Sequence, residues 1–161
     1  MVYTNARSIA NKLDDLYVLI NELSPSIICV TESWLDKNFS DDCLSFSNYT
    51  LFRSDRQTGH KGGGICVCTV TEFHVSFVFS ITDNTDVEAL ILRISYNTFH
   101  CILVTLYFPH GLLLNAEKVN TICKTLSDVI DDQLLFFLTA KCLSPATLIT
   151  SLLLYLRVTF A

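Results

Sequence analysis

The chain has 161 residues, half of them apolar, with a net charge of −5 and an isoelectric point of about 5.2. A chain of this length can bury one sizeable core, and the apolar content excludes a disordered or low-complexity protein. The acidic balance excludes a broad cationic surface for nucleic acid, so any contact with DNA is expected to be local.

Seven cysteines, at positions 29, 43, 66, 68, 101, 123 and 142, fall mostly inside apolar runs. There is no C-x-x-C pair, and the basic start, apolar run and small-residue cleavage site of a signal peptide are missing. A disulfide framework or a zinc site is one interpretation, and reduced, buried thiols are the favoured one. The chain is therefore expected to be intracellular, nuclear or cytoplasmic, and not secreted.

The first elements are a short extended segment that ends at Asn5 and an amphipathic helix over residues 9–23. Ser8 is the expected N-cap of this helix, and Ser24-Pro25 is the expected stop. One apolar stripe predicts that the helix packs on a sheet, and its residues are Ile9, Leu13, Leu16, Ile20 and Leu23.

Segments rich in β-branched and aromatic residues predict strands over 26–31, 49–52, 64–71, 73–80, 87–95 and 99–107. A tight turn at 96–98 is expected to join the last two into an antiparallel hairpin. A second helix over 115–130 and an apolar strand over 134–138 follow. This order predicts an α/β (α+β) sandwich in which mixed or antiparallel sheets are flanked by helices.

The most informative polar residue is Glu32, which follows the apolar run 27–30 directly after Thr31. A buried strand that releases a lone acid at its tip can hold a metal ligand rigidly. The alternative is a strand-end acid that is solvated or paired with an arginine or lysine. Asn5 and Tyr107 also end extended segments, and their plainer roles are a capping residue and a half-buried aromatic.

The run Gly62-Gly63-Gly64 lacks the Lys-Ser/Thr of a phosphate-binding P-loop and leads into a strand, so a flexible loop is the favoured interpretation. Arg53, Arg56, His60 and Lys61 surround it. These side chains are expected either to contact a DNA backbone or to form a solvated cationic loop.

Six segments, taken in order, resemble one family. They match N-A-R-S-I, N-K-x-D-x-L, P-x-I-I-x-x-T-E-x-W-L, Y-x-L-F-R-x-D-R, G-G-G-I and Y-R-P-P, at residues 5–9, 11–16, 25–35, 49–56, 62–65 and 107–109. The chain thus resembles the endonuclease/exonuclease/phosphatase superfamily, and within it the apurinic-endonuclease-like domain of non-LTR (LINE-type) retrotransposons. The resemblance covers residues 1–138 and leaves 139–161 as a divergent apolar tail.

The resemblance implies a four-layer αββα sandwich that nicks DNA with Mg²⁺ and was once fused to a reverse transcriptase. It implies that Glu32 is the Mg²⁺ ligand, and that Asn5 and Tyr107 are catalytic residues. In this family Asn5 would orient the phosphate or the metal shell, and Tyr107 would donate to the phosphate. Arg7, Arg53 and Arg56 are the expected nucleic-acid contacts.

The chain departs from the family where the strand over 134–138 should run into G-D-F-N, because Thr139-Ala140-Lys141-Cys142 stands there. The terminal D-H pair has no counterpart either, since residues 143–161 contain no Asp, Glu or His. His110, which stands in place of the family's second proline, is a weak candidate for the missing acid or base.

These departures predict a truncated or degenerate copy with impaired catalysis, incomplete at its C-terminus. One alternative is a non-catalytic remnant that binds nucleic acid or protein, and another is a sugar-phosphate or inositol phosphatase of the same superfamily. The tail is apolar, but the stretch between Lys141 and Arg157 contains Pro145 and falls short of the roughly 20 unbroken apolar residues of a membrane span. No membrane association is therefore expected.

Overall fold

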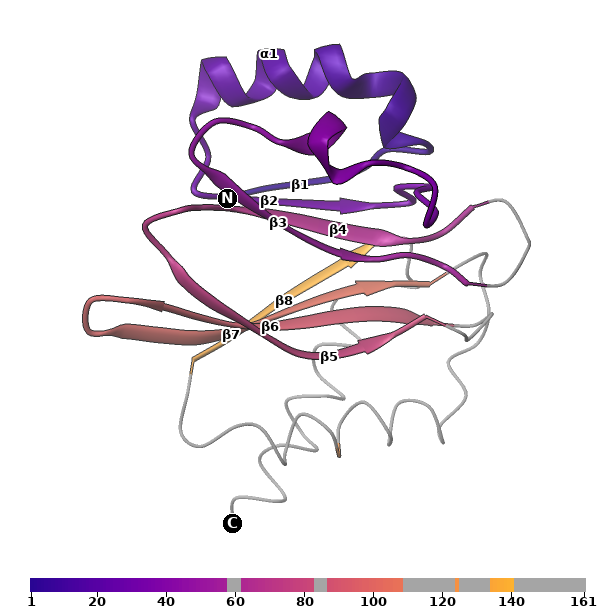
Figure 1. The fold of residues 1–161 in the computed structure, drawn as a ribbon. Helices are drawn as coiled ribbons and strands as arrows, with labels where there is room; N and C mark the ends of the chain where they lie inside the picture. The colour runs from indigo at the N-terminus through magenta and orange to yellow at the C-terminus, as the bar shows by residue number, and fades with distance from the viewer. Residues whose placement is uncertain (58–61, 83–86, 109–123, 125–133, 141–161) are drawn as a thin grey trace.

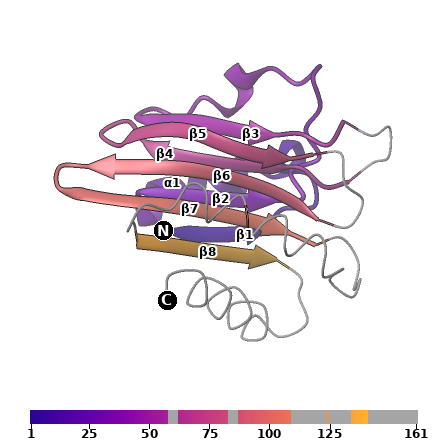
Figure 2. The same ribbon diagram turned by 90° about the horizontal axis from the view of Figure 1, so that it is seen from below.

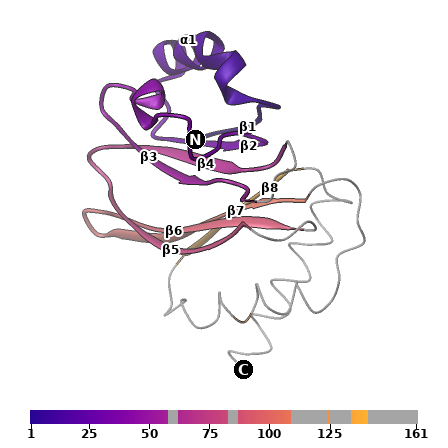
Figure 3. The same cartoon turned by 45° about the vertical axis from the view of Figure 1, so that its right-hand side comes forward.

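The computed structural model describes residues 1–57, 62–82, 87–108, 124 and 134–140, the last segment by its backbone alone. These residues form two four-stranded sheets, here called sheet A and sheet B, which pack face to face (Figure 1). Helix α1 covers the outer face of sheet A, so that helix, sheet A and sheet B make three successive layers (Figure 3).

Sheet A has the spatial order β1 (Val2–Asn5), β2 (Ile27–Thr31), β4 (Ile65–Val70) and β3 (Tyr49–Ser54). β1 and β2 are parallel, which requires a crossover, and the helical segment between them supplies it. β4 is antiparallel to both β2 and β3. The register pairs Asn5 with Thr31 and Thr31 with Ile65, so the ends of β1 and β2 meet the start of β4.

Sheet B has the order β5 (His74–Ile81), β6 (Glu88–Tyr96), β7 (Phe99–Tyr107) and β8 (Leu134–Ala140). The first three strands are antiparallel, with a register shift between Phe77 and Phe79, and β8 runs parallel to β7. The hairpin expected over 87–107 is confirmed, and Asn97 adopts a left-handed φ of +52° at its turn. β8 extends two residues beyond the expected strand.

The expected helix over 9–23 is wrong in its first turn. That turn is a separate 3₁₀ helix, η1 (Ile9–Lys12), and α1 spans Leu13–Leu23; another short 3₁₀ helix, η2, spans Asp41–Leu44. Ser8 makes no side-chain cap, because its backbone lies at φ +88° and its hydroxyl accepts a hydrogen bond from the side-chain Nδ2 of Asn11 at 3.1 Å. Ser24 does end the helix, in the left-handed conformation.

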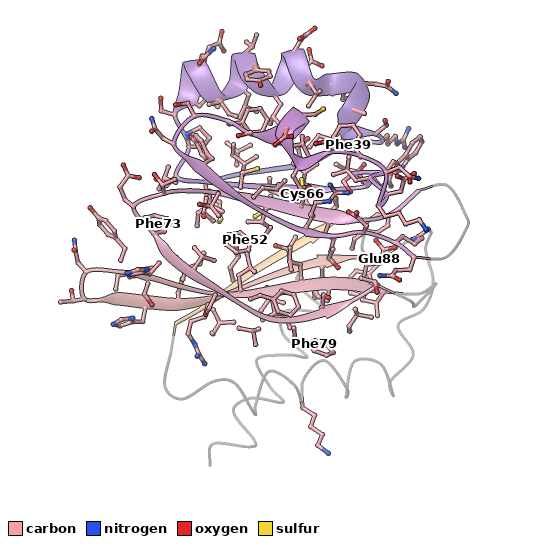
Figure 4. The ribbon with its side chains drawn as sticks, viewed as in Figure 1. Phe39, Phe52, Cys66, Phe73, Phe79 and Glu88 are labelled. Carbon is pink, nitrogen blue, oxygen red and sulfur yellow. The ribbon has the colours of Figure 1, made fainter. Side chains whose placement is uncertain are left out.

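The core has two layers separated by sheet A. In β2, Ile28 and Val30 pack toward α1, while Cys29 between them packs toward sheet B. β4 repeats this alternation, and Figure 4 shows Cys66 in this strand and Phe52 in the space between the two sheets. Burial on both faces is the reason that β2 and β4 read as continuous apolar runs.

The mixed-sheet sandwich expected from the sequence is therefore the observed fold. The second expected helix, over 115–130, and the helical layer it would add to sheet B lie outside the described residues apart from position 124, as does the tail from 141 onward. Within the described part of the chain, no helix is long and apolar enough to cross a bilayer.

Candidate active site at the strand ends

The topology gathers several strand ends at one edge of the sandwich. In sheet A, β1, β2 and β3 end there and β4 begins. In sheet B, β7 and β8 end there and β6 begins, since Tyr107 pairs with Glu88 and with Ala140. β1 and β8, the outermost strands of the two sheets, lie side by side (Figure 2). Side chains from both sheets can therefore meet at this edge.

Glu32, the first residue after β2, is the centre of this site. The residue is 5% exposed, and its backbone has a left-handed φ of +52°. A non-glycine residue in this conformation is held by its surroundings, and here the carbonyl of Glu32 accepts a hydrogen bond from the Ser8 amide at 2.9 Å. The strand end and the segment before η1 together fix the direction of this carboxylate.

Two neutral donors from different sheets bind one oxygen of this carboxylate. Asn5 Nδ2, from the end of β1, donates to Glu32 Oε1 at 3.1 Å, and the Tyr107 hydroxyl, from the end of β7, donates to the same oxygen at 2.8 Å. Burial, together with the bond to Glu32, raises the pKa of Tyr107 far above its ordinary value, so its hydroxyl is protonated at neutral pH. The structure thus brings Asn5, Glu32 and Tyr107 together.

The three candidate arginines have different surroundings. Arg7 is 67% exposed in its side chain, and its Nε lies 3.8 Å from Glu32 Oε2, at the open side of the site. Arg53 is 14% exposed and is bound by the carboxylates of Asp41 and Asp55 and by the carbonyls of Phe39 and Asp36. This geometry favours a structural role for Arg53.

Arg56 is equally buried, at 14% exposure of its side chain, and its Nε donates to Glu88 Oε1. Its Nη2 is buried without a hydrogen-bond partner. The role of Arg56 as a nucleic-acid contact stays a prediction.

Glu88, at the start of β6, is the site residue that sequence reasoning missed. It is 1% exposed, and Figure 4 shows it between the two sheets at the edge where the strand ends gather. Burial is the largest effect on the pKa of its carboxyl and raises it, and the nearby Glu32 carboxylate raises it further. The hydrogen bond from the Gly64 amide and the charge of Arg56 lower this pKa, but the net shift is upward. The sequence pattern that could have indicated Glu88 is a single acidic residue at the start of an apolar strand, just as Glu32 is a single acidic residue at the end of one.

The end of β8 lies beside the end of β7, because Leu106 pairs with Thr139 and Tyr107 with Ala140. Lys141 and Cys142, the rest of the tetrapeptide that replaces G-D-F-N, lie outside the described residues, as does His110. The strand tip next to Tyr107 therefore carries neither the aspartate nor the asparagine of that motif.

The oxygen atoms at the edge fit a hard divalent cation. Asn5 Oδ1 is buried without a hydrogen-bond partner and lies on the side chain that contacts the Glu32 carboxylate. Mg²⁺ takes oxygen ligands and is often held by one or two carboxylates completed by water and substrate phosphate. Among the described residues, no group of three or more His, Cys, Asp or Glu side chains could hold a metal ion. Of these residues, Glu32 and Asn5 would hold the cation.

Several solved structures share the fold of this chain. The first is TDP2 from D. rerio with a single-stranded DNA product, at a TM-score of 0.61 and 13% identity over 94% of this chain and 62% of that one. Another is the 3′ phosphatase NExo from Neisseria bound to a product DNA hairpin, with a TM-score of 0.58 and 15% identity. The match covers 86% of this chain and 55% of that one. A third is an AP endonuclease from Archaeoglobus fulgidus, with a TM-score of 0.57 and 19% identity. The match covers 86% of this chain and 55% of that one.

The chain therefore has the fold of the endonuclease/exonuclease/phosphatase superfamily. It spans less than two thirds of the length of these structures. No family model matches the sequence, and no curated protein matches it either.

Proposed function

We propose that the chain is a Mg²⁺-dependent phosphodiester hydrolase domain that acts on DNA, of the kind found in LINE-type retrotransposons, with impaired catalysis. The single observation that carries this proposal is the convergence on Glu32 of donors from both sheets, Asn5 from sheet A and Tyr107 from sheet B. A buried carboxylate oriented by two neutral donors, beside a free amide oxygen, suits a metal bound at the edge of a sandwich.

Each side chain has a distinct task in this proposal. Glu32 and Asn5 would hold Mg²⁺, which when bound neutralises charge on a phosphate. Tyr107 keeps its proton at neutral pH and can donate a hydrogen bond to a phosphoryl oxygen as negative charge develops there. Arg7 is exposed beside Glu32 and would attract the phosphate backbone.

Impairment is proposed because the described strand tip beside Tyr107 offers no side chain that could activate water. The strand tip beside Tyr107 carries Thr139 and Ala140, neither of which can act as a general base. Loss of general-base catalysis costs about 100- to 10,000-fold in rate. Activity close to background is the expectation.

The retrotransposon origin rests on the six motifs in their order. DNA is supported as the substrate by structures of the same fold, which contain a single-stranded DNA product and a product DNA hairpin. An ancestral fusion to a reverse transcriptase and a nuclear or cytoplasmic location belong to the same proposal.

The second candidate function is a remnant that binds DNA or protein without hydrolysis. It is favoured by the sequence Thr139-Ala140-Lys141-Cys142 at the position of the catalytic aspartate and asparagine. Binding would then use the exposed cation of Arg7 without turnover.

Nicking of supercoiled plasmid by the 161-residue chain, in Mg²⁺ and in EDTA, tests both candidates. Glu32→Gln removes the charge of the proposed ligand, and Glu22→Gln at an exposed position of α1 is the matched control. Nicking that needs Mg²⁺ and is lost only in Glu32→Gln supports the hydrolase. Absent nicking with salt-sensitive DNA binding supports a remnant that binds DNA. Absence of both contradicts the hydrolase and the DNA-binding form of the remnant.

A further inference from the structure

A buried ion pair lies beside the candidate active site and has no task in the proposed hydrolysis. Glu88 Oε1 accepts from Arg56 Nε, and Glu88 Oε2 accepts from the Gly64 amide at 2.6 Å. The two side chains are 2% and 14% exposed. Both carboxylate oxygens are thus bound by two different segments, the one that follows β3 and the one that precedes β4.

The glycine segment 62–64 connects this ion pair to the backbone after Glu32. The carbonyl of Gly64 accepts from the Ser33 amide at 3.1 Å, and the carbonyl of Gly63 accepts from the Trp34 amide at 3.0 Å. The chain of contacts therefore runs from Glu88 through Gly64 to Ser33, the residue bonded covalently to Glu32.

The segment after β2 needs such support because its backbone is strained. Glu32 and Trp34 both have left-handed φ values, +52° and +56°. Each such residue costs of order 1–3 kcal/mol and persists only when its surroundings determine it. On one side the segment is bound by the amides of Ser8 and Ile9, and on the other by the glycine carbonyls.

We propose that Glu88 and Arg56 form a positioning pair that fixes Glu32 through the glycine segment. Glu88 is not a catalytic residue, because it is buried and both of its oxygens are occupied. Its effect on metal affinity rests on the proposed function, whereas its effect on the backbone at Ser33 and Trp34 does not.

The test compares two replacements of a carboxylate by an isosteric amide. Glu88→Gln removes the charge that binds Arg56, and Asp55→Asn removes one of the two charges that bind Arg53. The other contacts of Arg53 run to the loop that contains Asp36, Phe39 and Asp41. Asp55→Asn is the control, since each variant removes one carboxylate from a guanidinium that is 14% exposed. Arg53 keeps the carboxylate of Asp41 in this control.

Two readouts are needed. Trp34 is the only tryptophan of the chain, and its amide is bound to Gly63, so acrylamide quenching of its fluorescence reports the glycine segment directly. Mn²⁺ titration followed by electron paramagnetic resonance reports the Glu32 site. Glu88→Gln is expected to raise the quenching constant and to weaken Mn²⁺ binding about tenfold, as the loss of an orienting group does in metal sites. Asp55→Asn is expected to change neither.

Unchanged Trp34 quenching in Glu88→Gln, or an equal change in Asp55→Asn, would overturn the positioning role. Arg56→Lys, which shortens the cation but keeps its charge, replaces Glu88→Gln if that variant does not unfold cooperatively, and the same results are expected. If the wild-type chain binds no Mn²⁺, the metal site of the proposed function fails, while the quenching comparison still decides the positioning role.

Discussion

The three arginines of the candidate site differ in how much of each side chain reaches solvent. Arg7 is largely exposed beside Glu32, whereas Arg53 and Arg56 are each 14% exposed and bound to carboxylates. An exposed guanidinium can exchange water for a phosphate at little cost, while a buried, paired one would first have to lose its partner. The presence of these arginines in the sequence motifs therefore does not predict which of them can bind a phosphate.

Arg7→Gln is expected to weaken DNA binding and lower its dependence on salt, with a change in unfolding free energy below about 0.5 kcal/mol. Arg53→Gln is expected to destabilise the fold by about 3 kcal/mol, because Asp55 and two backbone carbonyls lose their donor. Fluorescence anisotropy with labelled DNA and urea unfolding measure the two effects. A larger stability loss in Arg7→Gln than in Arg53→Gln would contradict the assignment.

Tyr107→Phe removes one of the two neutral donors to Glu32 Oε1. A buried charged acceptor that loses a donor costs about 1–3 kcal/mol, and this is the expected loss in urea unfolding at pH 7. Tyr17→Phe, on an exposed face of α1, is the control and is expected to cost less than about 0.5 kcal/mol. Equal losses in the two variants would show that the hydroxyl of Tyr107 contributes nothing specific.

At the scale of elements, the glycine segment 62–64 packs closely against the residues of the site. A Cβ on Gly63 would overlap the Glu88 carboxylate and lie 2.5 Å from Arg56 Cζ, and a Cβ on Gly64 would lie 2.5 Å from Ser33 Oγ. At Gly62 the nearest atom to such a Cβ would be Trp34 Nε1, at 3.7 Å. The sequence suggested a flexible loop, but two of these three glycines are required by close contacts.

Gly63→Ala is expected to be less stable than Gly62→Ala by about 1–3 kcal/mol in urea unfolding. Both glycines have positive φ, +72° at Gly63 and +110° at Gly62, and the value at Gly62 is the less favourable one for alanine. Lower stability of Gly63→Ala would therefore come from the overlap with Glu88 and Arg56 and not from backbone strain. Equal stability of the two variants would mean that the ion pair moves aside freely.

The sequence predicted those elements whose side chains repeat with a clear period, and it failed where tertiary contacts decide. The hairpin of β6 and β7 and the end of α1 at Ser24 follow from local residues. The first turn after Ser8 does not, because its amides bind the carbonyls of Glu32 and Ser33, a segment far along the chain. The helical spacing of apolar residues does not indicate such long-range hydrogen bonds.

The candidate site was predictable to a similar extent. A lone acid after an apolar strand pointed to Glu32, and the structure brings Asn5 and Tyr107 to it. Glu88 was missed because its importance depends on pairing with Arg56 across the two sheets, which no spacing in the sequence records. Arg53 resembled a surface cation because its partners Asp36 and Asp41 belong to another loop.

At the scale of the whole molecule, the two core layers place thiols on both faces of sheet A. Cys29 lies between the sheets and Cys68 lies under the helix. Burial raises the pKa of each thiol from its ordinary 9.0 to about 12. These thiols stay protonated in the folded chain and pack as small apolar groups.

The free energy of unfolding is expected to fall as pH rises above 9. In the unfolded chain the two thiols ionise near pH 9, but in the folded chain they resist ionisation up to about pH 12, so their stabilising effect is complete below pH 9 and is lost above it. At pH 10 the expected loss is about 2–3 kcal/mol for the two together.

Urea unfolding under reducing conditions at pH 7, 9 and 10 measures this slope. The double variant Cys29→Ala, Cys68→Ala is expected to have a shallower slope, while Cys43→Ala, at an exposed position, is expected to keep the slope of the wild type. The same slope in all three proteins would show that other groups control the alkaline loss.

The hydrogen bond from Tyr107 to Glu32 joins the two sheets across 75 positions of sequence. A half-molecule made of sheet A alone would keep the carboxylate and Asn5 but would lose the hydroxyl that completes their arrangement. The arrangement around Glu32 therefore depends on both sheets, and neither half of the sandwich would keep it alone. A substitution in either sheet that moves Asn5 or Tyr107 would change the surroundings of the same carboxylate.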